Sequence, residues 1–153
     1  QYIFLIGVYY HNKYYSFLMN SLTKEEETRV MLDFYNFWKE NNKPKIWYWY
    51  ADLMFWRKAV DRNGLDVLDM ENWNDLHQVF YQEPFTVKGC KNFKLKSYIK
   101  SLKELGKIDV ELPPSGCSNG LDALIIAWKY YKSKENGENN DSLLQSFNEI
   151  KSK

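Results

Sequence analysis

Cysteine and histidine are both scarce in this sequence, which contains two residues of each type. Cys90 and Cys117 lack the close spacing of paired metal ligands, and His11 and His77 lie far apart in the chain. This separation argues against a zinc site and against a histidine-based nucleophile triad. The cysteine usage is typical of a reduced protein, so we expect an intracellular chain.

Long hydrophobic runs are also missing. The apolar run 2–10 is far shorter than the roughly 20 residues that a membrane-spanning helix needs, so we expect no membrane association. The sequence contains no Walker loop, dinucleotide-binding fingerprint, nucleophile elbow, paired-cysteine zinc pattern or internal repeat. The chain therefore shows none of the short motifs that identify the commonest enzyme classes.

Net charge is low, at a formal +1 at pH 7, and neither favours nor opposes an anionic partner. The distribution of charge is more informative. Residues 61–83 carry six acids and one basic residue, Arg62, whereas residues 86–107 carry seven lysines and one acid, Glu104. This arrangement is typical either of a metal site beside a phosphate-binding track or of two solvated faces.

Aromatic residues, by contrast, are abundant. They make up 18% of the chain, which is more than a hydrophobic core requires, so we expect some tryptophan and tyrosine side chains to line a surface groove. The length of 153 residues fits a single domain, 1–153, with a sizeable core of its own.

The most aromatic stretch, residues 46–57, organises the chain. Residues 46–50 follow Pro44 and favour an interior strand, and residues 53–60 have the apolar spacing of a helix. Asp52 lies between them, at the carboxyl edge of the expected sheet, where open α/β sheets bind ligands. Asp52 is therefore either a helix N-cap or a metal-binding or catalytic acid.

Local patterns predict the remaining elements. Thr23 and Glu26 have the spacing of a capping box, in which each side chain bonds the backbone amide of the other residue. In chain order, we expect hairpin strands at 2–10 and 14–19, a helix at 23–41, a short strand or helical turn at 74–80, and helices at 95–105, from 120 and at 141–150. The residues of the helix from 120 that are expected to face the core are Leu121, Leu124, Ile125 and Trp128.

Taken together, three parts of the chain resemble ribonuclease-H-like DEDD exonuclease domains, in the branch of RecB-associated nucleases found in bacteria and large DNA viruses. They are 46–52 (IWYWYAD), then 73–80 (WNDLHQVF) with 83–89 (EPFTVKG) and 92–96 (NFKLK), and finally 117–128 (CSNGLDALIIAW). The branch often has histidine where Tyr48 stands and glutamate where Asp52 stands, so this chain departs from the pattern at both positions.

The resemblance implies an α/β fold with a ribonuclease-H-like mixed sheet and flanking helices. It also implies two Mg²⁺ or Mn²⁺ ions about 3.5 to 4 Å apart, held by several carboxylates, which activate water and stabilise the leaving oxygen of a phosphodiester. The family has an Asp-x-Glu pair on its first strand and a final aspartate after its last helix. The Asp-x-Glu matches at 69–71 and 109–111 come too late in the chain for the first role. We therefore expect an internal piece of the domain that lacks its first strand and its last acidic motif.

The function implied is that of a metal-dependent nuclease, a 3′-to-5′ exonuclease acting on DNA or RNA. The expected catalytic acids are Asp52 and Asp75, and the expected metal ligands are Asp52 and Asp122. Asp75 is alternatively a helix cap, and Asp122 is alternatively a first-turn acid that the helix dipole favours. A domain that has lost its acids, acting as a non-catalytic nucleic-acid-binding or scaffolding module, is the competing interpretation.

Nucleic-acid contacts are expected from the lysine-rich part of the chain. The residues expected to bind backbone phosphates are Lys88, Lys91, Lys94 and Lys96. Trp49 or Tyr50 is either a core residue or one that stacks on a terminal base. The expected partners are DNA or RNA and other domains of a longer parent chain, in the cytoplasm or in a viral replication compartment.

Overall fold

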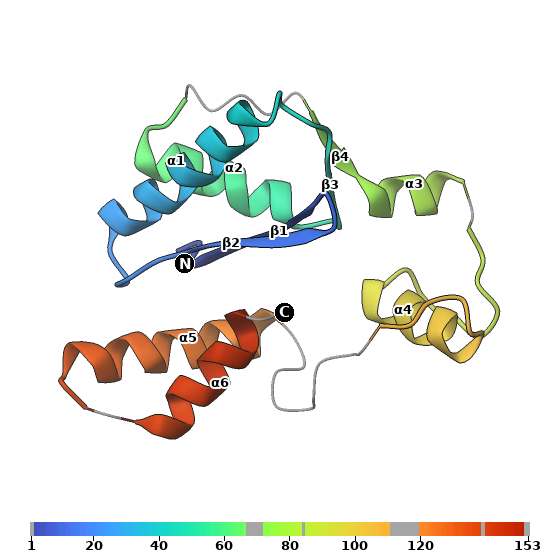
Figure 1. The fold of residues 1–153 in the computed structure, drawn as a ribbon. Helices are drawn as coiled ribbons and strands as arrows, with labels where there is room; N and C mark the ends of the chain where they lie inside the picture. The colour runs from blue at the N-terminus through green and yellow to red at the C-terminus, as the bar shows by residue number, and fades with distance from the viewer. Residues whose placement is uncertain (1, 67–71, 84, 111–119, 139, 152–153) are drawn as a thin grey trace. The chain divides into compact units, whose positions relative to one another are not determined.

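The computed structural model describes residues 2–66, 72–83, 85–110, 120–138 and 140–151. The helices and strands are labelled in Figure 1. Contacts divide the chain into two compact units. Unit 1 comprises Gln1–Asn42 and Pro113–Lys153, and unit 2 comprises Lys43–Leu112. Unit 1 contains β1, β2, α1, α5 and α6, and unit 2 contains β3, α2, β4, α3 and α4.

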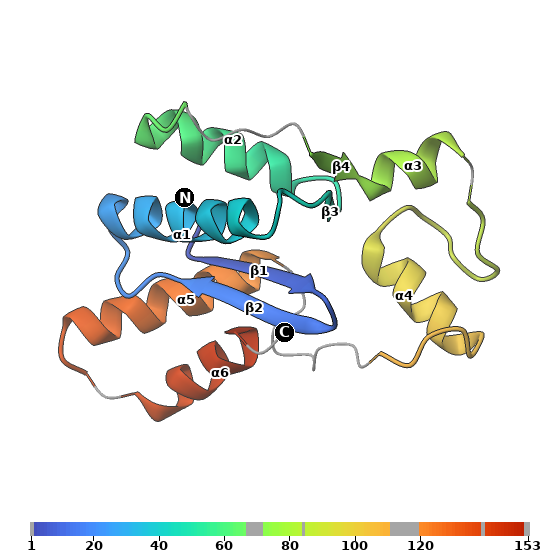
Figure 2. The ribbon, with the colours of Figure 1, turned by 45° about the horizontal axis from the view of Figure 1, so that its top comes forward.

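Unit 1 begins with the expected hairpin. Strands β1 (Leu5–Tyr10) and β2 (Lys13–Leu18) pair antiparallel along their whole length. His11 and Asn12 join them with φ values of 48° and 59°, so both turn residues are left-handed. A two-residue turn of this kind matches the natural twist of paired strands, and the predicted hairpin is confirmed. Figure 2 shows the hairpin with α1 alongside.

Helix α1 (Lys24–Glu40) confirms the predicted helix but only half of the capping box. The Thr23 hydroxyl accepts a hydrogen bond from the Glu26 amide at 3.2 Å. The Glu26 carboxylate instead accepts bonds from the Asn20 amide at 2.7 Å and from Arg29, and the Thr23 amide donates to the Ser21 carbonyl. Glu26 bonds the guanidinium of Arg29 and not the Thr23 amide, because a charge-assisted hydrogen bond is stronger than one to a neutral amide.

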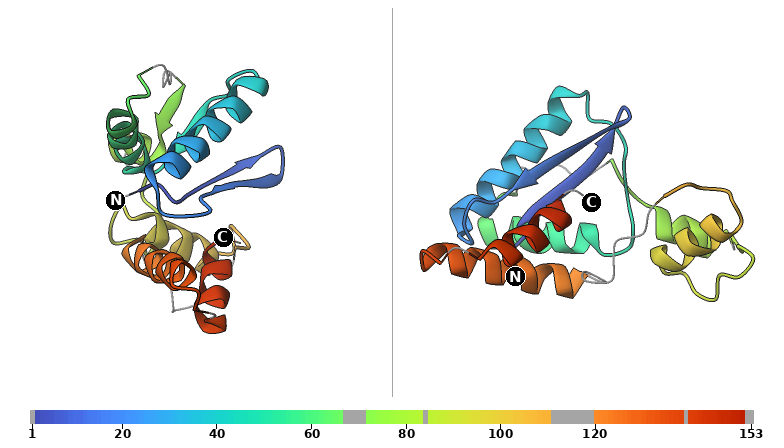
Figure 3. Two further views of the ribbon diagram at one scale, coloured as in Figure 1. Left: turned by 90° about the vertical axis from the view of Figure 1, so that its left-hand side faces the viewer. Right: turned by 60° about the horizontal axis from the view of Figure 1, so that its bottom comes forward.

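The core of unit 1 joins the hairpin to three helices. Helices α5 (Gly120–Glu135) and α6 (Asp141–Lys151) run beside each other (Figure 3). The buried core residues are Met19, Val30, Ala127, Tyr131 and Phe147. The Tyr131 hydroxyl donates a 2.6 Å hydrogen bond to the Met19 carbonyl, which satisfies the one polar atom of this large side chain inside the core.

The predicted core face of α5 is wrong. Of the four predicted residues only Leu124 is partly buried. Leu121, Ile125 and Trp128 are 64%, 42% and 54% exposed, whereas Ala127 and Tyr131 are buried. Large apolar residues occur on more than one side of this helix, so their spacing alone does not select the packed side. The buried side is the one where the small Ala127 allows close approach and where the Tyr131 hydroxyl finds a partner.

Unit 2 is built around a parallel strand pair. Strand β3 (Ile46–Tyr48) pairs with β4 (Trp73–Asp75), and Tyr48 lies opposite Asp75. The sequence predicted a longer strand at 46–50, but the chain leaves the extended conformation before Tyr50, whose φ is 66°. The remaining helices of the unit are α2 (Asp52–Asn63), α3 (Leu76–Gln82) and α4 (Leu95–Glu104). Helices α2 and α4 confirm the helices expected after Asp52 and before Gly106. The segment 74–80, expected as a short strand or a helical turn, contains both the end of β4 and most of α3.

The described residues form six helices and two small sheets, one antiparallel and one parallel. The mixed α/β class expected from the sequence is confirmed. The ribonuclease-H-like mixed sheet stays a prediction. Across the part of the chain that the structure describes, none of the helices combines the length and the apolar character needed to cross a membrane.

Candidate functional site

The carboxyl ends of β3 and β4 bring two acids to one edge of the parallel sheet. Asp75 is the last residue of β4, and Asp52 opens the helix that follows β3. Parallel strands end at the same edge, which explains why residues so far apart in the sequence meet here. One Asp75 oxygen, Oδ1, accepts hydrogen bonds from the Tyr50 amide at 3.1 Å and from the His77 amide at 2.9 Å. Asp75 is therefore also the N-cap of α3.

Asp52 does not cap α2. Ala51 occupies the N-cap position and makes no side-chain hydrogen bond, so the helix-cap interpretation of Asp52 is wrong. Its Oδ2 accepts a 3.3 Å bond from the Trp49 amide instead. Although Asp52 as a whole is exposed, partial loss of solvent around its carboxylate raises the pKa of Asp52, and the negative charge of Asp75 raises it further. The bond from Trp49 acts in the opposite direction.

Tyr48 is a third member of this site, which sequence reasoning did not assign. Loss of solvent around its phenol raises the pKa of Tyr48, and the charges of Asp75 and Asp52 raise it further. The charge of Arg57 opposes this shift. The phenol therefore lies within the electric field of both carboxylates and stays protonated at neutral pH. Its register position opposite Asp75 was not predictable without knowing which strands pair.

The donor chemistry of the site suits a hard divalent cation. Carboxylates are oxygen ligands of the kind that Mg²⁺ and Mn²⁺ prefer. Among residues the structure describes, no group of three or more histidine, cysteine, aspartate or glutamate side chains is placed to hold a metal ion. A two-metal centre would require carboxylates beyond Asp52 and Asp75.

The predicted phosphate-binding lysines lie on the loop before α4 and on its first turn. All four of them, Lys88, Lys91, Lys94 and Lys96, are exposed. The Asn92 side chain accepts a 3.0 Å hydrogen bond from the Lys94 amide and so shapes the start of the helix. The first turn of α4 contains no acid, so its positive dipole end and its lysines act in the same direction on a nearby anion.

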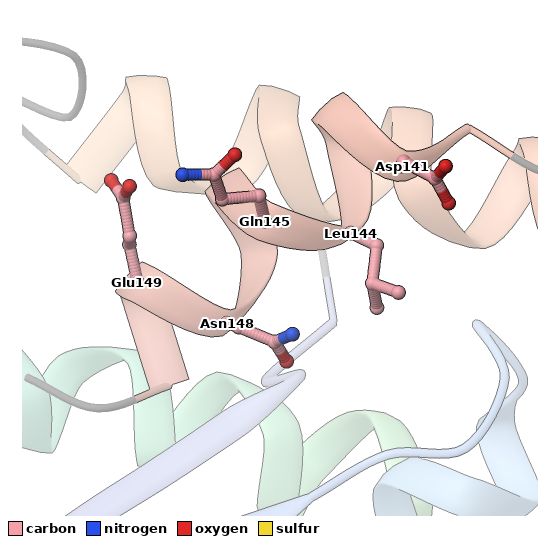
Figure 4. Close-up of a pocket in the computed structure, with 5 residues that line it drawn as sticks. All are labelled: Asp141, Leu144, Gln145, Asn148 and Glu149. Carbon is pink, nitrogen blue, oxygen red and sulfur yellow. The ribbon is translucent and has the colours of Figure 1, made fainter.

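Other predicted residues belong to unit 1 or fall at least partly outside the described residues. Asp122 is in the first turn of α5, in unit 1, where the helix dipole favours an acid, and its role as a metal ligand stays a prediction. The Asp-x-Glu match at 69–71, the end of the match at 109–111, and Cys117 fall outside the described residues. A shallow hollow on α6 is lined by five side chains, all from that one helix (Figure 4). It lacks the convergent polar groups of a ligand site.

The aromatic residues of unit 2 separate into buried and exposed members. The Trp49 ring centroid lies 5.4 Å, 5.5 Å and 5.8 Å from those of His77, Phe80 and Tyr98, so Trp49 is a packing residue. Tyr50 is 66% exposed. His77, which looked unpaired in the sequence, packs in an aromatic cluster, and its buried Nδ1 has no hydrogen-bond partner among the described residues.

Comparison of the chain with protein families, with curated proteins and with solved structures finds no match.

Proposed function

We propose that the chain is part of a metal-dependent nuclease, a 3′-to-5′ exonuclease that hydrolyses phosphodiesters of DNA or RNA. The observation that carries the proposal is the pairing of Asp52 and Asp75 at one carboxyl edge of the parallel strands. The ionised carboxylates of Asp52 and Asp75 repel each other. A divalent cation bound between them attracts both and so removes this repulsion.

In this proposal Asp52 and Asp75 hold a Mg²⁺ or Mn²⁺ ion. The metal supplies an activated water and stabilises the leaving oxygen. A complete two-metal centre takes its other carboxylates from the first-strand and last acidic motifs of the family, with Asp122 as a weaker candidate from within this chain. The Tyr48 phenol stays protonated beside the two acids, and the lysines before and on α4 hold the phosphate backbone.

The test is the digestion of an end-labelled oligonucleotide with Mg²⁺ or Mn²⁺. It is run on the 153-residue chain and on a longer polypeptide that includes its native flanking sequence. We expect cleavage by the longer form, lost in Asp52→Asn and in Asp75→Asn. Both variants retain the fold because asparagine accepts the same backbone hydrogen bonds and is an equally good N-cap.

The matched control is Asp61→Asn, which neutralises an exposed acid at the other end of α2. This variant is expected to cleave like the unaltered protein. Cleavage by Asp52→Asn at the unaltered rate would contradict the site assignment, and an inactive longer form would contradict the nuclease proposal itself.

A non-catalytic nucleic-acid-binding module is the second candidate. The observation that favours it is that the described residues contain no group of three or more potential metal-ligating side chains. This candidate predicts oligonucleotide binding that is unchanged when EDTA removes divalent cations. Binding that disappears on addition of EDTA would count against it.

A further inference from the structure

Tyr50 has an unusual backbone conformation next to the two acids. Its φ of 66° is left-handed, a conformation that bulky side chains rarely adopt and that glycine or asparagine adopts readily. The Tyr50 amide donates to Asp75, and the Ala51 amide donates to the Trp49 carbonyl, so hydrogen bonds on both sides hold the conformation. Strain of this kind is concentrated at functional sites. A large aromatic side chain is thus retained where the backbone alone would favour a small residue.

The Tyr50 side chain is mostly exposed to solvent. It is 66% exposed, whereas the preceding residue, Trp49, packs among three rings of the unit. The Tyr50 ring rests against His77, with centroids 5.1 Å apart and the ring planes at 62°. This contact orients the ring and leaves most of its surface accessible to a ligand.

His77 connects Tyr50 to further exposed aromatic surface and to the lysine-rich loop. The His77 ring stacks near Tyr81, which is 63% exposed, and also contacts Phe93. Phe93 lies 5.4 Å from the Tyr81 ring and is flanked in the chain by Lys91 and Lys94. Tyr50 and Tyr81 are exposed, and the partly buried rings of His77 and Phe93 join them. We call these four rings, together with the exposed Lys91 and Lys94, the aromatic–lysine surface.

We propose that Tyr50 stacks on an unpaired base, so that the aromatic–lysine surface binds single-stranded nucleic acid beside Asp52 and Asp75. Exposed rings with lysines close to them in the chain match the two chemical parts of a single strand, because bases stack on rings and phosphates pair with lysines. A duplex offers only its phosphates, since its bases are already stacked on each other. The inference rests on the proposed function and specifies its substrate as a single-stranded end.

The test measures the affinity of the whole chain for a fluorescent single-stranded oligonucleotide and for its duplex, in EDTA so that nothing is cleaved. Tyr50→Gly removes the ring and fits the left-handed backbone better than tyrosine does. We expect it to melt at the same temperature as the unaltered protein or higher, and to bind the single strand about tenfold more weakly, as loss of one stacked base predicts. Duplex affinity is expected to stay unchanged.

Three further variants complete the design. Tyr50→Phe keeps the ring and is expected to bind within about twofold of the unaltered protein, since stacking does not need the hydroxyl. Tyr50→Asn tests loss of the ring with a second residue that tolerates the left-handed conformation. Tyr9→Ala removes a 72% exposed tyrosine from β1 of unit 1 and is expected to leave affinity unchanged.

Unaltered single-strand affinity in a folded Tyr50→Gly or Tyr50→Asn variant would overturn the inference, as would an equal loss for the duplex or no binding at all. These results are distinguishable from failure of the nuclease proposal. If Asp52→Asn abolishes cleavage and Tyr50→Gly binds normally, the nuclease stands and the stacking role fails. If no form cleaves but Tyr50→Gly loses single-strand affinity, the stacking role stands on a non-catalytic module.

Discussion

At the scale of single residues, Asp75 combines two structural tasks with its proposed catalytic one. The same oxygen accepts the Tyr50 amide, which helps to hold the left-handed turn after β3, and the His77 amide, which caps α3. Replacement by alanine would therefore remove a helix cap and loosen the turn beside Asp52 at the same time. Asparagine preserves both bonds, so it is the variant that separates chemistry from folding.

The ionised Asp52 side chain should lower the free energy of unfolding at neutral pH. Its raised pKa means that the folded chain binds a proton more tightly than the unfolded chain, so folding becomes less favourable as pH rises through the ordinary and then the folded pKa of this group. We expect Asp52→Asn to melt at the same temperature as the unaltered protein, or higher, at pH 7. The difference should vanish below pH 3.8, the ordinary pKa of the group, where both side chains are neutral.

Thermal unfolding followed by circular dichroism at the two pH values measures this effect. A lower melting temperature for Asp52→Asn at pH 7 would show that the bond from the Trp49 amide to the ionised carboxylate outweighs the repulsion from Asp75. Loss of cleavage together with unchanged or increased stability is the pattern expected of a residue retained for function.

At the scale of elements, Arg29 and Glu26 fasten the start of α1 to the end of β2. Arg29 donates to the Leu18 carbonyl at 2.8 Å and pairs with Glu26 and Asp33, and Glu26 accepts the Asn20 amide. The helix and the strand thus share one charged network across the short connection between them. This network holds the first turns of α1 next to the end of β2.

Glu26→Gln should weaken this junction in a pH-dependent way. Hydrogen bonding to Arg29, followed by the bond from the Asn20 amide, lowers the pKa of Glu26 from 4.5 to about 2. A carboxyl with a lowered pKa stabilises the fold above its unfolded pKa, and this stability is lost as pH falls through the folded value. We expect Glu26→Gln to lower the free energy of unfolding by about 1 to 2 kcal/mol at pH 7, with the difference shrinking towards zero near pH 2.

Urea unfolding at pH 7 and near pH 2 tests this prediction. Glu25→Gln is the matched control, because Glu25 lies exposed in the same helical turn and makes none of these bonds. An equal loss of stability in both variants would instead indicate a general effect of the negative charge on the N-terminal dipole of α1.

At the scale of the whole molecule, a net charge of +1 supplies almost no long-range attraction for nucleic acid. Any electrostatic affinity must come from the local excess of lysine before and on α4. Each phosphate contact on a single strand contributes about −0.7 to the slope of log affinity against log salt concentration, so four contacts predict a slope of about −3.

Successive Lys→Gln replacements at the four predicted positions should therefore flatten the salt dependence step by step. The residues replaced are Lys88, Lys91, Lys94 and Lys96. Lys24→Gln and Lys129→Gln, exposed lysines of unit 1, are expected to leave the slope unchanged. Equal flattening by either set would mean that binding follows the overall charge and not the aromatic–lysine surface.

Local chemistry explains which elements were predictable. The hairpin, α1, α2 and α4 follow from turn residues, caps and apolar spacing within a few residues of each other. The predictions that proved wrong had different causes. The packed side of α5 was decided by contact with Met19, which is 112 positions from Tyr131. The second half of the capping box failed for a local reason, because Arg29, three positions along the chain, bonds the Glu26 carboxylate.

The sequence by itself determined that an acid follows an aromatic strand at Asp52, that another precedes a helix at Asp75, and that lysines gather before α4. Only the tertiary structure decided that the two acids lie at the same edge of the sheet. Parallel pairing of β3 with β4 brings Asp75 to the turn after β3, where it holds the amide of Tyr50, 25 positions away in the chain. The physical reason is that spacing along a chain determines local conformation, whereas strand pairing and side-chain packing determine which distant groups share one field, one hydrogen bond or one surface.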